Sequence, residues 1–87
     1  MVRVIGSREE AGGARYIEFA VHRSPTDPER VLGNWRVTHG DSLVDQNRHE
    51  AAVAIEFRLV LDCADQNGIP FVWVNDPEQL FPPWERR

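Results

Sequence analysis

Hydrophobic and polar side chains alternate along residues 15–22, where every second residue from Ile17 to Val21 is apolar. A period of two is typical of a β-strand that buries one face. The apolar residues at 2–5 indicate either an earlier strand or a frayed end. They belong to an N-terminal segment, residues 1–13, whose three glycines predict flexibility.

A β-hairpin is predicted in the middle of the chain. Residues 35–39 alternate again, and Gly40 and Asp41 suit the tight two-residue turn of a hairpin. Residues 42–45 should therefore form the return strand of an antiparallel pair.

The connector before this hairpin carries the signals of a short helical turn. Asp27 is a suitable N-cap, Pro28 suits the first helical position, and Gly33 suits the end of the turn.

A long helix is predicted over residues 47–66. Asn47 is a candidate N-cap, with Glu50 at the spacing of a capping box. Gly68 should end the helix, and Pro70 prevents its continuation. This helix is the central element of the predicted fold.

The predicted helix has two apolar faces when its residues are placed about 100° apart. The inner stripe, which should pack on the sheet, consists of Val53, Phe57, Val60, Leu61 and Ala64. The outer stripe consists of Ala52, Ile55, Leu59 and Cys63. Three explanations of the outer stripe remain open: a second copy covers it in a dimer, the C-terminal tail covers it, or it is exposed to solvent.

Residues 71–74 are apolar on both faces, which favours a strand in the interior of the sheet. The predicted fold class is therefore α+β: a three- to four-stranded, mainly antiparallel sheet with one long helix on one face, in β-β-β-α-β order. We expect one domain over residues 1–87, with its core at 14–76 and an apolar tail at 77–87.

Composition adds limits on function and location. The net charge is −4 and all ten basic residues are arginines without a basic stripe, which disfavours nonspecific nucleic-acid binding. Cys63 is the only cysteine, so no internal disulfide is possible, and no apolar run reaches the ~20 residues of a membrane span. A soluble cytoplasmic protein is expected.

The best candidate for metal binding or acid–base chemistry is formed by His22, His39 and Asp41, with His49 and Asp45 nearby in sequence. None of these residues has a metal-ligand spacing such as His-x-x-x-His. Solvated surface histidines are the alternative interpretation, and we predict no metal, cofactor or catalytic residue.

Aromatic residues offer two further possibilities. Trp35, Phe71 and Trp73 are either a stacking platform or part of the core. The tail residues Leu80, Phe81 and Trp84 either dock on a partner or pack on their own domain. The candidate interface is therefore formed by Ala52, Ile55, Leu59, Cys63, Leu80, Phe81 and Trp84.

Two resemblances rest on short motifs. The span 35–76 resembles small bacterial domains with a strand, hairpin, helix, strand order; the matching motifs are Trp35-Arg36-Val37, Glu50-Ala51 and Phe71-Val72-Trp73-Val74. The motif Gly40-Asp41-Ser42-Leu43 resembles the segment that enters the helix of the partial ferredoxin-like domain of HicB-type antitoxins. Neither resemblance assigns a functional residue.

Three functional hypotheses follow from these patterns. The first is a non-enzymatic protein-interaction or regulatory module that forms a homodimer or docks on a protein partner. The second is a small enzyme, ligand-binding or metal-binding domain that uses His22, His39 and Asp41. The third, which the second resemblance implies, is an antitoxin-like regulator linked to nucleic acid.

Overall fold

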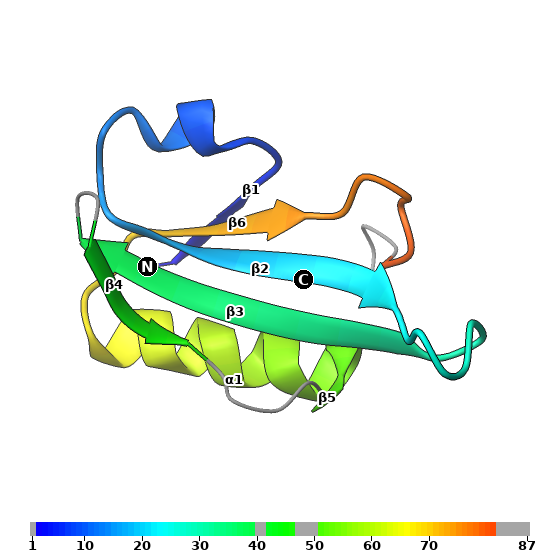
Figure 1. The fold of residues 1–87 in the computed structure, drawn as a ribbon. Coiled ribbons are helices and arrows are strands. Elements are labelled where there is room, and N and C mark those ends of the chain that lie inside the picture. The colour runs from blue at the N-terminus through cyan, green and yellow to red at the C-terminus, as the bar shows by residue number, and fades with distance from the viewer. Residues whose placement is uncertain (1, 40–41, 47–50, 82–87) are drawn as a thin grey trace.

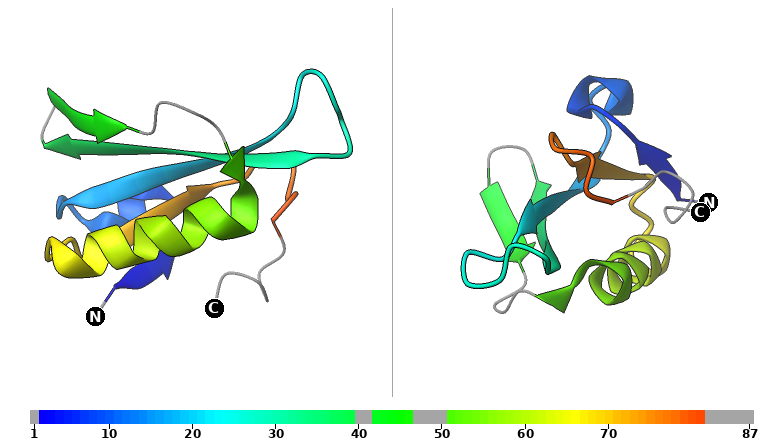
Figure 2. Two further views of the ribbon diagram at one scale, coloured as in Figure 1. Left: turned by 90° about the horizontal axis from the view of Figure 1, so that it is seen from below. Right: turned by 90° about the vertical axis from the view of Figure 1, so that its right-hand side faces the viewer.

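The computed structural model describes residues 2–39, 42–46 and 51–81 (Figure 1). Its elements are β1 (Arg3–Ile5), the 3-10 helix η1 (Arg8–Ala11), β2 (Tyr16–Arg23), β3 (Val31–His39), β4 (Ser42–Gln46), β5 (Ala51–Ala52), α1 (Val53–Gln66) and β6 (Phe71–Asn75). The strands form one sheet in the order β1-β6-β2-β3-β4, with β5 also paired to β3. α1 covers one face of this sheet, and η1 lies on the opposite side (Figure 2).

The α+β class is confirmed, but the prediction of a mainly antiparallel sheet is wrong. β6 runs parallel to both of its neighbours, β1 and β2, whereas β3 pairs antiparallel with β2, β4 and β5. The reason is the crossover: α1 carries the chain back along the sheet, so β6 starts again in the direction of β5 and β2. The predicted interior position of the last strand is confirmed.

α1 begins later than the sequence predicts. Ala51 and Ala52 form β5 and pair with Gly33 and Leu32 of β3, so the helix starts at Val53. The pairing with β3 outweighs the high helix propensity of alanine. The proposed cap at Asn47 and Glu50 lies outside the described residues.

The end of α1 agrees with the prediction. Gly68 adopts a left-handed conformation with φ of 66°. The Ile69 N–H donates to the Ala64 carbonyl at 2.8 Å, and the Gly68 N–H donates to the Asp65 carbonyl at 3.3 Å. These two bonds form a Schellman motif, and the buried Ile69 anchors the end of the helix in the core.

The connector before β3 forms a β-turn instead of the predicted helical turn. The Arg30 N–H donates to the Asp27 carbonyl, and the Asp27 carboxylate accepts the Glu29 N–H. Gly33 does not end a helix, because β3 already starts at Val31 and pairs with β2. Asp27 therefore stabilises a tight turn between two long strands.

The alternation of the predicted strand at 15–22 is confirmed in β2, where Ile17, Phe19 and Val21 are buried against α1. The return strand is confirmed as β4, with Ser42 opposite His39. The two residues of the predicted turn, 40 and 41, lie outside the described residues.

The N-terminal segment, for which the sequence predicts flexibility, contributes β1 and η1. Ile5 and Ala11 are buried. The Glu10 carboxylate accepts the N–H groups of Gly6 and Ser7 at 2.7 and 2.9 Å, and these bonds lower the pKa of Glu10. η1 is thus held in place over the β1–β6 corner of the sheet.

The core between the sheet and α1 is centred on three phenylalanine rings. The ring centroid of Phe57 lies 5.4 Å from that of Phe19 and 5.0 Å from that of Phe81. Gly33 lies directly above Phe19: a Cβ at this position would be 2.5 Å from Cζ of the ring. The glycine therefore allows β3 to pass close to the aromatic core.

Candidate functional site

The outer surface of α1 carries the exposed apolar side chains. Among the described residues, Ile55 and Leu59 are the large hydrophobic residues that are exposed to solvent, with 61% and 54% of their surface accessible. They lie one helical turn apart and therefore form one patch. The other members of the outer stripe, Ala52 and Cys63, are partly buried.

The described part of the C-terminal tail, which ends at Phe81, packs on the opposite side of α1. Phe81 is 1% exposed and contacts Phe57 and Phe19 in the core, and Leu80 packs against the same cluster. The Asp76 carboxylate accepts the N–H groups of both residues at 2.8 Å. Phe81, which the sequence assigns to the candidate interface, is thus a core residue, and Trp84 lies outside the described residues.

Charged side chains flank the apolar patch. Arg58 and Asp62 are both exposed, and they follow Ile55 and Leu59 by three residues each. Each therefore lies beside the patch, about one turn further along α1. The surface is self-complementary in composition: two apolar side chains, one positive charge and one negative charge.

The strand pairing keeps the candidate histidines apart. His22 of β2 lies opposite Leu32, and His39 lies seven residues further along β3. At about 3.3 Å per residue this is roughly 23 Å, too far for a shared metal ion or proton. Pairing of β2 with β3 therefore does not bring the two histidines together.

The remaining members of that set are not assembled into a site. Asp41 and His49 lie outside the described residues, and Asp45 lies on β4. Within the part of the chain that the structure describes, no group of three or more His, Cys, Asp or Glu side chains could hold a metal ion.

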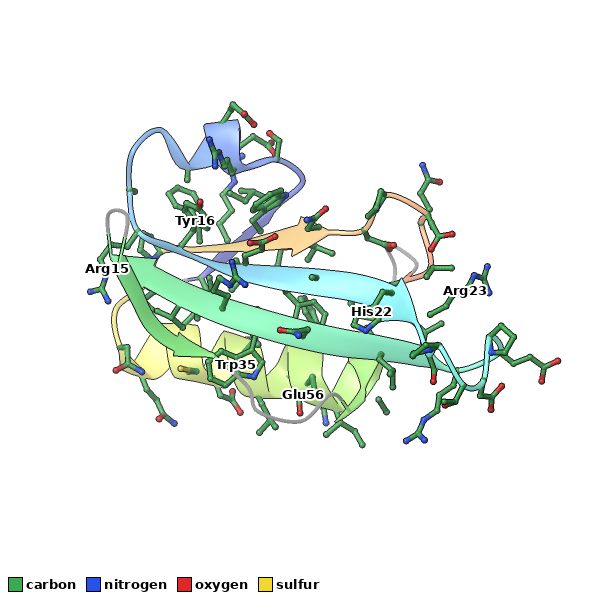
Figure 3. All side chains as sticks on the ribbon, in the orientation of Figure 1. Arg15, Tyr16, His22, Arg23, Trp35 and Glu56 are labelled. Carbon is green, nitrogen blue, oxygen red and sulfur yellow. The ribbon has the colours of Figure 1, made fainter. Side chains whose placement is uncertain are left out.

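The aromatic residues proposed as one stacking platform lie on two sides of the sheet. Trp35 pairs with the buried Phe19 on the α1 side, whereas Trp73 and Phe71 alternate with the buried Val72 on the other side. The Trp35 Nε1–H donates to the Glu56 carboxylate at 3.1 Å (Figure 3). A single platform is therefore excluded.

Glu56 is a buried carboxylate that the sequence interpretation passed over. It is 8% exposed and lies in the first turn of α1, directly before Phe57. The sequence signal for the burial of Glu56 was its position at the border of the inner stripe. Its bond to Trp35 ties α1 to β3, so we assign it a structural role.

Cys63 is a free, partly buried thiol on the same helix. The Asn67 side-chain amide donates to the Cys63 carbonyl at 2.8 Å and lies 3.6 Å from its sulfur. These contacts belong to the end of α1.

Comparison with protein family models, curated proteins and solved structures gives no match for this chain. Among the described residues, no helix has the length and apolar character needed to cross a bilayer. The exposed patch on α1 is therefore interpreted from its own chemistry.

Proposed function

We propose that this protein is a small protein-interaction module that forms a homodimer through the outer surface of α1. The observation that carries the proposal is the exposure of Ile55 and Leu59 as neighbours on one helix. Burial of such a side chain is worth roughly 1.5–3 kcal/mol relative to full exposure. A cytoplasmic location and a regulatory role belong to the same proposal.

A second copy of α1 is the occupant favoured by the pattern of charges. Consider an antiparallel pair whose two-fold axis crosses the two helices at the level of residue 60. Arg58 of one copy then faces Asp62 of the other, because each lies two residues along the helix from that level. The pair forms twice, once on each side of the axis. The Leu59 side chains of the two copies then become neighbours, about 3 Å apart along the helix axes.

The expected dimer is weak. Two helices of 14 residues bury on the order of 1,000 Å² in total, which is at the low end of specific interfaces. We expect a dissociation constant on the order of 100 µM. Self-association should therefore depend on protein concentration between about 10 µM and 1 mM.

The test is sedimentation velocity over this range on wild-type protein and on Leu59→Asp. The wild-type protein should move from the 10.0 kDa monomer toward the dimer as concentration rises. Leu59→Asp should stay monomeric, since it would bury two charges at the axis. The matched control is Ala54→Asp, an exposed position on α1 outside the stripe, which should behave as wild type. A wild-type monomer at about 1 mM would refute the proposal.

A charge reversal tests the antiparallel arrangement separately. Arg58→Asp alone places like charges opposite each other and should weaken the dimer about tenfold. Adding Asp62→Arg should restore it. Failure of the double variant to recover would contradict this orientation, even if Leu59→Asp abolishes the dimer.

A further inference from the structure

A pocket of about 420 Å³ lies at the carboxyl ends of the parallel strands β1 and β6. Its walls include Gly6, Ser7, Trp73, Asn75, Asp76 and Gln79. The volume lies within the usual range for small-molecule sites. This pocket is separate from the outer surface of α1.

The pocket exists because the chain leaves the two neighbouring strands toward opposite faces of the sheet. After β1 the chain turns into η1, on the side away from α1 (Figure 1). After β6 it turns toward the α1 side, where Phe81 packs on Phe57. In open sheets, ligands bind at such points, in the crevice beyond the carboxyl ends of the strands.

The lining combines one aromatic ring with side-chain amides. The edge-on contact with Tyr16, at 6.1 Å between ring centroids, fixes the Trp73 ring. The Asn75 amide donates to the Glu18 carboxylate at 3.0 Å, which fixes its orientation. Gln79 adopts a left-handed conformation with φ of 55°, held by the turn that Asp76 closes. The Trp73 ring and the Asn75 amide are thus positioned by Tyr16 and Glu18, which lie outside the pocket lining.

The charges near the pocket disfavour ionic ligands. The main-chain N–H groups of Gly6 and Ser7, which would suit an anion, already bind the Glu10 carboxylate. Each oxygen of the Asp76 carboxylate already accepts a main-chain N–H group, from Leu80 and Phe81, so the carboxylate is engaged within the protein. A neutral ligand that is rich in hydrogen-bonding groups fits this lining best.

We propose that this pocket binds a neutral, polyhydroxylated ligand of the size of a hexose. The apolar C–H face of a pyranose ring would pack on Trp73. Its hydroxyls, which both donate and accept, would meet the amide of Gln79, the Asn75 amide oxygen and second N–H, and the Ser7 hydroxyl, which donates to Glu10 at 3.4 Å and can still accept.

The experiment is an NMR titration of the full chain with methyl glucoside, methyl galactoside and methyl mannoside up to about 100 mM, the range for weak small ligands. At least one glycoside should cause saturable shifts of the Trp73 indole N–H and the Asn75 amide. The Trp35 indole, bonded to Glu56 on the α1 side, is the internal control and should not shift. Tetramethylammonium, phosphate and adenosine are titrated in parallel. No shift with any glycoside, or larger effects with one of these three, would overturn the proposal.

Two variants then test the assigned contacts. Trp73→Ala should weaken glycoside binding at least about tenfold. Because that variant also loses a packed ring, Gln79→Gly is the second test: glycine adopts a positive φ readily, so the turn is preserved while the amide is removed. It should weaken binding about threefold, and Gln66→Ala, which removes an exposed amide on α1, should not. Unchanged binding in Gln79→Gly would overturn the assignment.

Discussion

The two faces of α1 carry similar apolar side chains and have different surroundings. On the inner face, Phe57 and Val60 are 2% and 1% exposed and pack against the sheet and the tail. On the outer face, Ile55 and Leu59 remain more than half exposed. The fold buries Phe57, Val60 and Ala64 of the inner face, and Val53 and Leu61 pack against the same core while partly buried. The side chains of Ile55 and Leu59 are not among the residues that form or pack against the core of the monomer, which is why we propose that they belong to an interface.

The largest loss of stability is expected when a side chain on the inner face of α1 is truncated. Phe57→Ala removes a ring from the phenylalanine cluster and should lower the free energy of unfolding by about 3–5 kcal/mol. Leu59→Ala in dilute, monomeric protein should cost less than about 1 kcal/mol. Denaturant unfolding measures both. Similar losses for the two variants would show that Leu59 is part of the monomer core.

A smaller effect is expected where β3 approaches the inner face. Gly33→Ala places a methyl group against the Phe19 ring and 3.3 Å from Cβ of Glu56, so it should cost about 1–3 kcal/mol. The control is Gly6→Ala, whose Cβ would have only an ordinary contact with Glu10. A neutral Gly33→Ala would mean that the contact between β3 and the core is looser than described.

The Asp76 carboxylate holds Leu80 and Phe81 of the tail on the inner face of α1. Removal of this carboxylate measures how much that contact contributes to stability. Asp76→Ala leaves the main-chain N–H groups of Leu80 and Phe81 without their acceptor and should cost about 1–2 kcal/mol. Hydrogen exchange of these two amides should accelerate. Asp65→Ala, an exposed carboxylate on α1, is the control and should change neither quantity.

The smallest effect is expected at η1, away from both faces of α1. The bonds from Gly6 and Ser7 lower the pKa of Glu10 in the folded protein, so its contribution to stability is complete above the unfolded pKa. That contribution is lost as the pH falls through the lower, folded pKa. The stability difference between wild type and Glu10→Gln should therefore shrink in acid. A difference that is constant with pH would contradict this assignment.

The elements that could be predicted from the sequence are those with a local signal. The alternation around Ile17 and the glycine and proline after α1 identify β2 and the helix end without knowledge of their partners. The start of α1 could not be predicted, because Ala51 and Ala52 are helix formers that become a strand only through pairing with Leu32 and Gly33.

The candidate sites divide in the same way. Three members of the outer stripe, Ile55, Leu59 and Cys63, lie on one helix, so they could be identified from spacing alone, whereas Ala52 belongs to β5. The bond between Trp35 and Glu56 joins residues 21 positions apart, and the pocket joins Ser7 to Trp73. Such contacts depend on the strand order, which the sequence pattern did not specify. The burial of Phe81 likewise depends on the turn at Asp76.

The most direct test of the central claim is an isotope-filtered NOE experiment on a mixture of labelled and unlabelled protein at about 1 mM, above the expected dissociation constant. Such a spectrum contains only contacts between two copies. The account predicts NOEs between the Leu59 methyl groups of the two copies and from Ile55 to the last turn of the facing helix. Absence of these signals, or intermolecular NOEs confined to other surfaces, would contradict the assignment of the outer face of α1 to a homodimer.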